Sequence, residues 1–220
     1  MLGIWDKIQR VKHNKGYGVQ SPAAFHFVTQ VLRNKEQYYI YPQLDNVALA
    51  TGEFSPVHCR RLFRVANYLQ PQNIILYNAG KGSIACALSA GKQNVPLHYI
   101  ARNDNINPEA KRFLRDRISK HISETPINEL KSILEKENTI GMLHIIADEN
   151  LLEVIDVATK HINKKSVIII EGIHYDKVLS KQWETIKKHS KSVITFDLYS
   201  MGIIFFDNEY KKQHYTLLLQ

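Results

Sequence analysis

The sequence predicts an α/β fold, a three-layer sandwich in which helices cover both faces of a mostly parallel sheet. From about residue 71 onward, short apolar runs rich in Val and Ile alternate with longer stretches of helical spacing. The runs are nearly continuous, which is typical of parallel strands buried on both faces. A length of 220 residues with 44% hydrophobic and 23% charged residues suffices for one such domain and excludes a disordered or fibrous chain.

The predicted elements follow one another in order along this part of the chain. Strands are expected at Ile74–Tyr77, Leu97–Ile100, Leu143–Ile146, Val167–Ile170, Val193–Phe196, Ile203–Phe206 and Gln213–Leu219. Helices are expected at Ser83–Ala90, Pro108–Lys120, Ile127–Glu137, Leu151–Ile162 and Lys177–His189. The last three strands are joined by links too short for parallel crossovers, so the C-terminal end is predicted to be antiparallel.

Residues 1–70 form a predicted helical extension that packs on the α/β domain of residues 71–220. Ser21-Pro22 and Ser55-Pro56 each indicate a helix start, with Ser as the N-cap and Pro at the first helical position. The Tyr-rich segment around residues 38–41 lies between these two helices and is expected to be irregular.

The charge of the chain is basic but dispersed. Lys and Arg number 29 against 21 Asp and Glu, a formal net charge of +8, and they are spread over the whole length. Most are expected on the solvated faces of outer helices, so nucleic acid is not favoured as a partner. No apolar run approaches the roughly 20 residues of a membrane span. Cys59 and Cys86 are too few for a disulfide framework or a cysteine zinc site, so we expect a reducing cytoplasm and no metal.

The loop after Ile74–Tyr77 is the first candidate site, because ligands of open parallel sheets bind at the carboxyl ends of strands. It reads Asn78-Ala79-Gly80-Lys81-Gly82-Ser83 and then enters a helix. Its glycines and the helix N-terminus offer backbone N–H groups that can hold a phosphate or carboxylate. It is not a P-loop, because Gly82 stands where that motif needs Ser or Thr. The alternative is a tight turn that simply needs small residues.

Glu171 and His174 are the candidate catalytic residues. They follow the predicted strand Val167–Ile170 at its carboxyl end, where a general base would be placed. The alternative is an ordinary helix start, in which Glu lies near the positive end of the helix dipole.

Several local strings resemble the class I S-adenosylmethionine-dependent methyltransferases, in particular a bacterial subset with a helical N-terminal extension. The strings are Gly18–Pro22, Ser166–Asp176, Trp183–Lys187, Phe196–Phe206 and Lys211–Tyr215. The resemblance covers nearly the whole chain and implies a seven-stranded Rossmann-like sheet with a C-terminal antiparallel hairpin. It also implies a set of cofactor-binding positions. These are Tyr77, Ala79, Gly80, Gly82, Ser83, Ala101, Arg102, Ala147 and Asp148.

Two of the strand ends depart from the cofactor motifs of that family. The family's first strand ends in an acidic residue before a glycine-rich loop, whereas Tyr77 and Ala79 stand at the acidic and first glycine positions here. The family's second strand ends in Asp or Glu, which binds the ribose hydroxyls. Ala101 stands at that position and Arg102 follows it. Both departures remove a contact to the same ligand.

The later strand ends show a similar loss of acidic residues. The family's fourth strand often ends in an acidic residue, and Ala147 stands there, followed by Asp148. After the fifth strand the matching acid is Glu171, but its usual acidic neighbour is Gly172. A shift of register could let Asp104 or Asp148 replace a missing carboxylate.

Three functional hypotheses follow from the resemblance and its departures. The first is a methyltransferase-fold protein with a degenerate cofactor site and a non-catalytic or repurposed binding role, with a small molecule, a protein or a second copy as partner. The second is an active O-methyltransferase that uses S-adenosylmethionine, with Gly80, Gly82 and Ser83 at the methionine end and Glu171 or His174 as the base. The third is an anion- or nucleotide-binding module built on the Gly80–Ser83 loop with Lys81.

Overall fold

The computed structural model describes residues 21–218. These residues form two compact units, one of residues 35–146 and one of residues 21–34 together with 147–218. We call them the central unit and the terminal unit. Residues 1–20, which begin the predicted helical extension, lie outside the described residues.

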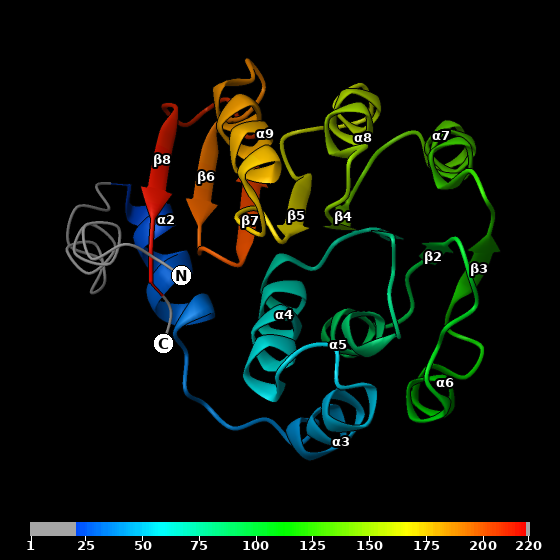
Figure 1. The fold of residues 1–220 in the computed structure, drawn as a ribbon. Coiled ribbons are helices and arrows are strands. Elements are labelled where there is room, and N and C mark those ends of the chain that lie inside the picture. Colours follow the sequence, from blue (N-terminus) through cyan, green and yellow to red (C-terminus); the bar gives the residue numbers. More distant parts are fainter. Residues whose placement is uncertain (1–20, 219–220) are drawn as a thin grey trace. The chain divides into compact units, whose positions relative to one another are not determined.

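The central unit contains a parallel sheet of four strands. These are β1 (Ile74–Tyr77), β2 (Leu97–Ala101), β3 (Ser119–Ile122) and β4 (Met142–Ile146). Their order is β3-β2-β1-β4, and all three pairings are parallel. The helices are α3 (Tyr41–Thr51), α4 (Pro56–Leu69), α5 (Ser83–Gly91), α6 (Pro108–Leu114) and α7 (Pro126–Glu137). In Figure 1, α7 lies on one side of this sheet, and α4 and α5 lie on the other.

The terminal unit contains four further strands. These are β5 (Val167–Glu171), β6 (Ile194–Asp197), β7 (Met201–Phe205) and β8 (Gln213–Thr216), in the order β5-β7-β6-β8. The helices are α2 (Pro22–His26), continued by the π-helix η1 (Phe27–Leu32), α8 (Leu151–Ala158) and α9 (Lys177–Lys188). Figure 1 shows α9 and α2 on opposite sides of this group of strands. The centroid of the Phe27 ring lies 5.4 Å from the Phe196 ring centroid and 5.1 Å from the Phe205 ring centroid. These aromatic contacts cover one face of the strands β6 and β7.

The buried strands and the two Ser-Pro helix starts are confirmed. Every residue of β1 and β5 is buried, as expected for strands covered on both faces. The Ser21 hydroxyl accepts a hydrogen bond from the Ala24 N–H, and the Ser55 hydroxyl accepts one from the His58 N–H. These are the N-cap contacts that the sequence predicts.

The central unit differs from the prediction at two elements. Residues 34–40 lie outside helices and strands as expected, but at Tyr41 the chain enters α3, a helix that was not predicted and that buries Leu44, Val47 and Ala48 at helical spacing. The helix expected to continue to Lys120 stops at Leu114, and residues 119–122 form β3 instead. No residue of β3 is fully buried, so this edge strand lacks the apolar run by which the other strands are recognised.

The C-terminal topology is partly as predicted. β6 and β7 form the expected antiparallel hairpin, but β8 pairs with β6 in parallel. β7 lies between β5 and β6, so both of its edges are already paired. The chain that leaves β7 must therefore pair beyond β6, and its reversed direction makes β8 parallel to β6. With β3 included, the described residues contain eight strands where seven were expected.

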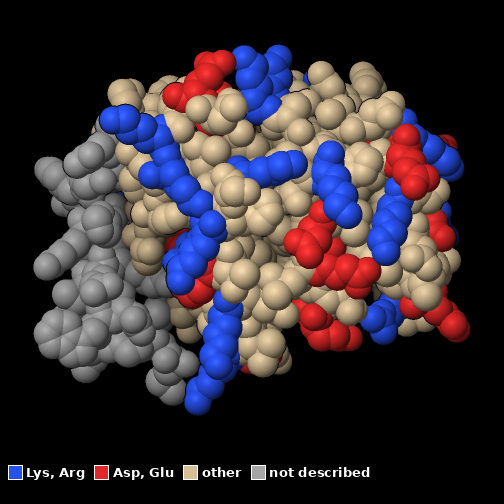
Figure 2. Space-filling model, turned by 90° about the horizontal axis from the view of Figure 1, so that it is seen from above, with Lys and Arg blue, Asp and Glu red and all other residues tan. Residues whose placement is uncertain are grey.

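The surface and the helices bear on two further expectations. On the face shown in Figure 2, Lys and Arg side chains are interspersed with Asp and Glu and do not form one continuous patch. Within residues 21–218, none of the helices is both long and apolar enough to cross a bilayer.

Candidate functional site

The loop between β1 and α5 is tightly shaped by its backbone. Asn78, Gly80 and Gly82 have positive φ angles of 55°, 66° and 98°. The Asn78 side-chain amide donates to the Ile146 carbonyl at 3.2 Å, and the Ala79 N–H donates to the Ile100 carbonyl at 3.0 Å. The loop is therefore fixed to the ends of both neighbouring strands, β4 and β2, and its N–H groups are held in place before any ligand arrives.

The carboxylate of Glu53 occupies the anion-binding side of this loop. The Lys81 N–H donates to both carboxylate oxygens, with its nitrogen 3.0 Å from each, and the Ser83 hydroxyl donates to Oε2 at 3.1 Å. A Cβ atom built on Gly80 would lie 1.9 Å from Glu53 Oε1, so only glycine allows this approach. The loop with its two glycines and helix N-terminus thus holds a carboxylate, as its sequence predicts, but the carboxylate belongs to the chain itself.

Two helix ends place Glu53 at the loop. Gly52 ends α3 in the left-handed conformation, with φ of 61°, and its N–H donates to the Ala48 carbonyl. Ser55 then caps α4. Glu53 lies in the short link between the two caps, so its direction is set by both helices. Local sequence does not connect Glu53 with this loop, because its partners lie about 30 positions further along the chain.

The side chain of Lys81 points to a different partner from the one expected for an anion-binding lysine. Its Nζ donates to the Thr51 carbonyl at 3.4 Å, at the end of α3. The Lys81 carbonyl in turn accepts from the Asn107 N–H, and the Asn107 side chain donates to the Ala50 carbonyl. The lysine therefore joins the loop to the C-terminus of α3, where a positive charge is favourable.

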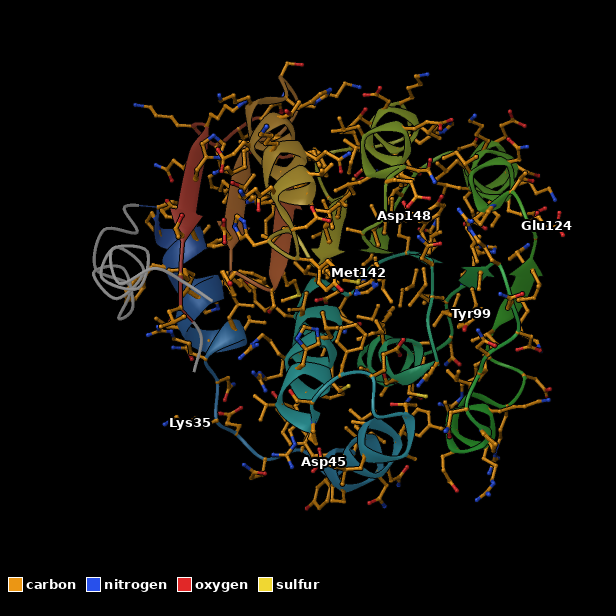
Figure 3. The ribbon with its side chains drawn as sticks, in the orientation of Figure 1. Lys35, Asp45, Tyr99, Glu124, Met142 and Asp148 are labelled. Atoms are coloured by element: carbon orange, nitrogen blue, oxygen red, sulfur yellow. The ribbon has the colours of Figure 1, made fainter. Side chains whose placement is uncertain are left out.

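The end of β2 carries no carboxylate. Ala101 is buried, and its carbonyl accepts from the Ser123 N–H, while Arg102 beside it is exposed. Tyr99 lies on β2 (Figure 3) with its side chain fully buried. Its hydroxyl donates to the Gly80 carbonyl. Burial, followed by the negative charge of Glu53, raises the pKa of Tyr99. The Tyr99 hydroxyl therefore stays neutral and holds the loop through its hydrogen bond to the Gly80 carbonyl.

The carboxylates that could replace the missing ones are engaged elsewhere. Asp104 Oδ2 pairs with Lys120 Nζ at 2.7 Å, and this contact lowers the pKa of the Asp104 carboxyl. Asp148 Oδ1 accepts from the Asn150 N–H at 2.9 Å, just before α8 begins. The Ala147 N–H donates to the Glu171 carbonyl. Tyr77, at the expected acidic position of β1, is only 1% exposed.

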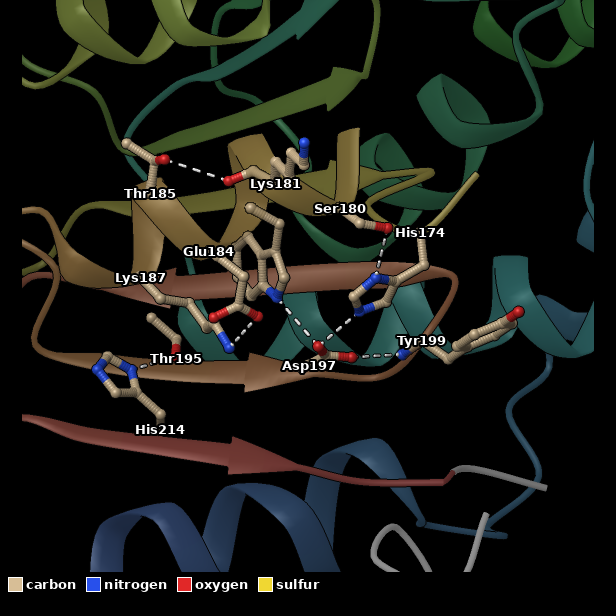
Figure 4. Close-up of polar contacts among 11 residues, drawn as sticks. His174, Ser180, Lys181, Glu184, Thr185, Lys187, Thr195, Asp197, Tyr199 and His214 are labelled. Carbon is tan, nitrogen blue, oxygen red and sulfur yellow. Dashed lines mark hydrogen bonds and ion pairs between the residues drawn. The ribbon is translucent and has the colours of Figure 1, made fainter. Parts of the chain in front are cut away.

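His174 belongs to a polar network in the terminal unit that Figure 4 shows. Its Nε2 lies 2.7 Å from Asp197 Oδ2, and its Nδ1 lies 3.1 Å from the Ser180 hydroxyl. Asp197, which is 4% exposed, also accepts from Trp183 Nε1 at 3.0 Å and from the Tyr199 N–H at 2.9 Å. The network joins α9 to the turn between β6 and β7, and both imidazole nitrogens take part in it.

Glu171, the other predicted catalytic residue, is the last residue of β5. It is 3% exposed and is opposite Met201 of β7 in the sheet register. The sequence predicts it in the loop after the strand, whereas the strand extends through it. The catalytic role of Glu171 and His174 stays a prediction. The sequence does not point to Asp197, Trp183 or Ser180 as members of the His174 network, because their spacing from His174 follows no recognisable motif.

Comparison with known proteins gives matches in structure alone. No family model matches the sequence, and no curated protein sequence resembles it at a significant level. A methyltransferase of Podospora anserina with S-adenosylhomocysteine bound matches with a TM-score of 0.63, at 10% identity over 86% of this chain and 97% of that one. An O-methyltransferase from Bacillus cereus, also in complex with S-adenosylhomocysteine, matches with a TM-score of 0.59 at 14% identity, over 83% and 97%.

A third solved structure extends the match over more of the chain. It is an O-methyltransferase from Streptomyces achromogenes in complex with S-adenosylmethionine, involved in tomaymycin synthesis, with a TM-score of 0.59 at 12% identity over 91% of this chain and 99% of that one. The chain has the fold of the class I S-adenosylmethionine-dependent methyltransferases. The predicted fold class is confirmed, with one strand more than expected.

Within this methyltransferase fold, the predicted cofactor positions of the central unit divide into two groups. Gly80 and Ser83 meet at the Glu53 carboxylate. Tyr77 and Ala101 close the ends of β1 and β2 with buried side chains that carry no negative charge. The Lys81 N–H and the Ser83 hydroxyl are therefore engaged by Glu53, and Tyr77 and Ala101 place no carboxylate at the ends of β1 and β2. The cofactor-binding role of these positions stays a prediction.

Proposed function

We propose that this chain is a methyltransferase-fold protein that does not use S-adenosylmethionine as a methyl donor and has a repurposed binding role. The observation that carries the proposal is the Glu53 carboxylate on the Lys81 N–H and the Ser83 hydroxyl. A carboxylate-bearing ligand would need the same donors. It would have to displace Glu53 or lie beside it.

Electrostatics opposes a second carboxylate beside Glu53. Two like charges 4 Å apart repel by about 1 kcal/mol in water and by about 4 kcal/mol at the effective dielectric constant of roughly 20 that suits protein surfaces. Glu53 is only partly exposed, so its repulsion lies between these values. Displacement instead removes two hydrogen bonds to a charged group. Either route weakens binding of the methionine end of the cofactor.

The ribose end lacks a compensating contact. Ala101 offers no oxygen for the ribose hydroxyls, and Asp104 is paired with Lys120. A hydrogen bond to a charged group contributes about 1.5–3 kcal/mol, so a missing bidentate carboxylate weakens cofactor binding markedly. The residues of the central unit therefore do not fit S-adenosylmethionine, because the carboxylates that the motifs of this fold place at the strand ends are missing from Tyr77 and Ala101.

The alternative function is an active O-methyltransferase with an atypical pocket, and the structural neighbours with bound S-adenosylmethionine or S-adenosylhomocysteine favour it. In that case Glu53 would leave the loop, and Gly80, Gly82 and Ser83 would hold the methionine end. Glu171 or His174 would be the base. For the preferred function, we propose a small molecule or a protein as the binding partner and the reducing cytoplasm as the location. The buried Cys59 and Cys86, which form no disulfide in the described residues, support this location.

Isothermal titration calorimetry with S-adenosylmethionine and S-adenosylhomocysteine tests the proposal. The parent protein is expected to give no binding heat up to millimolar ligand. Micromolar binding of either ligand to the parent would refute it. Glu53→Ala and a matched control, Glu135→Ala on the exposed face of α7, complete the design. If Glu53 blocks the site, only the first variant gains affinity for either ligand.

A further inference from the structure

A pocket lies between α3, the end of α5 and α6, all within the central unit. Its volume is about 440 Å³, within the range of small-molecule sites. The residues that line it come from these three helices, from the residue before α3 and from the turns after α5 and α6. They are Ile40, Gln43, Asn46, Val47, Ala90, Gln93, Glu109, Arg112, Phe113, Arg115 and Arg117. None of them belongs to the Asn78–Ser83 loop, so this arginine pocket is distinct from the Glu53 site.

The lining of the arginine pocket has an excess of positive charge. Three arginines line it, and Glu109 is the one carboxylate among the lining residues. Glu109 is paired with Arg112, whose Nη1 lies 2.9 Å from Oε1. Within the described part of the chain, neither Arg115 nor Arg117 forms an ion pair with a carboxylate. Two guanidinium groups at the pocket are thus available to an anion.

The backbone just after α6 brings both arginines to the lining of the pocket. α6 ends at Leu114, and Arg115 follows with φ of 48° and ψ of −122°, a conformation that residues other than glycine rarely adopt. The Arg115 N–H donates to the Lys111 carbonyl, and the Arg117 N–H donates to the Leu114 carbonyl, each at 2.9 Å. Strained backbone of this kind is concentrated at ligand-binding positions.

A helix-dipole role does not account for both arginines. Basic residues are commonly found in the last turn of a helix, where they stabilise its negative end. In α6 that turn already contains Lys111 and Arg112. Arg115 is the C-cap residue of α6 and Arg117 lies two residues beyond it, and both line the pocket.

The remaining lining residues define the ligand. The planar fork of arginine matches two oxygens of a phosphate group, and two such groups suit a dianion. Gln43, Asn46 and Gln93 add amide donors and acceptors, and Val47 and Phe113 add apolar surface. We propose that the arginine pocket binds a phosphate monoester with a small organic body. Free phosphate shares the charge of such a ligand but not its apolar part.

Calorimetry with adenosine monophosphate, inorganic phosphate and adenosine as probes tests this assignment. We expect the monophosphate to bind the parent protein more tightly than phosphate does, and adenosine to bind more weakly than both. Arg115→Gln combined with Arg117→Gln should weaken binding of the monophosphate by at least about tenfold, because two charge-assisted contacts are removed. A double variant Lys160→Gln, Lys181→Gln in the terminal unit removes the same charge from exposed positions and should change binding less than about twofold.

A second variant keeps the test decisive if the double arginine variant does not fold. Gln93→Glu places a carboxylate on the exposed rim of the pocket and should reduce binding of the monophosphate to the same degree. The proposal is overturned if the parent binds neither phosphate probe, or if the arginine and lysine variants behave alike. It is also overturned if single-stranded RNA binds with a steep salt dependence while the monophosphate does not.

Discussion

Replacing Glu53 by Ala tests whether an internal carboxylate stabilises the loop between β1 and α5. The variant removes the acceptor of hydrogen bonds from the Lys81 N–H and the Ser83 hydroxyl, at 3.0 and 3.1 Å. Hydrogen bonds to a charged group contribute about 1.5–3 kcal/mol, and the partial exposure of Glu53 favours the lower end of that range. We expect the free energy of unfolding to fall by about 2 kcal/mol, which lowers the Tm of a chain of this size by roughly 4–8 °C.

Scanning calorimetry measures this change against the matched variant Glu135→Ala. The control removes an exposed carboxylate from α7 and is expected to change the free energy of unfolding by less than about 0.5 kcal/mol. Added acetate should raise the Tm of the Glu53→Ala protein more than that of the parent, because the freed donors can bind an external anion. Equal melting of the two variants, or an equal response to acetate in variant and parent, would refute the reasoning.

A double-mutant cycle separates the contact at Gly80 from its backbone conformation. In the parent, Gly80→Ala meets both a φ of 66° and the Glu53 Oε1 atom, which would lie 1.9 Å from the new Cβ. In the Glu53→Ala background only the backbone penalty remains. We expect the second Gly80→Ala to cost less than the first, with a coupling of about 1–3 kcal/mol. Additive effects would mean that Glu53 is not held at the loop.

Three further predictions concern groups outside the loop. Asp197→Ala should lower the free energy of unfolding by about 3–5 kcal/mol, because it leaves the His174 and Trp183 donors without their buried carboxylate. Urea titrations measure this change, and a loss below about 1 kcal/mol would contradict the prediction. Gly202→Ala places a Cβ 2.6 Å from the Trp183 ring and should cost about 1–3 kcal/mol, whereas a melting temperature equal to that of the parent would show that the ring moves aside. Burial lowers the pKa of His121, so the unfolded chain binds this proton first as the pH falls below about 6.5 and stability decreases there. His121→Gln should make that decrease shallower in urea titrations between about pH 7 and pH 5, and an unchanged slope would argue against it.

Most of the strands that the sequence predicts are largely buried; β8, which is mostly partly exposed, is the exception among them. β1 and β5 consist of Ile, Leu and Val up to their last residues, Tyr77 and Glu171, because no face of either strand meets water. β3 is polar at the edge of its sheet, so no apolar run distinguishes it from the basic stretch before it. The parallel pairing of β8 depends on β7 lying between β5 and β6, which is a property of strand order and leaves no mark in local sequence.

The candidate site was predictable only as far as local sequence determines it. The glycines of the Asn78–Ser83 loop, and its place at the end of a buried strand, indicate an anion site without any knowledge of the fold. Glu53 could not be connected with the loop, because the link between α3 and α4 reaches it through tertiary packing of both helices. A carboxylate between a Gly C-cap and a Ser N-cap is the local signal that was present.

The two glycines of this loop have structural explanations that do not involve a cofactor. Gly80 is required by the approach of Glu53, and a Cβ on Gly82 would lie 2.9 Å from the Cβ of Ala110 on α6. A glycine-rich turn in a methyltransferase fold is therefore weak evidence for cofactor binding when an acidic side chain of the same chain reaches its N–H groups. In this chain the loop retains the anion-binding geometry, while Tyr77 and Ala101 provide none of the carboxylates expected at the strand ends. The combination is consistent with a loop that is kept for stability, because removal of Glu53 would leave the Lys81 N–H and the helix N-terminus without their anion.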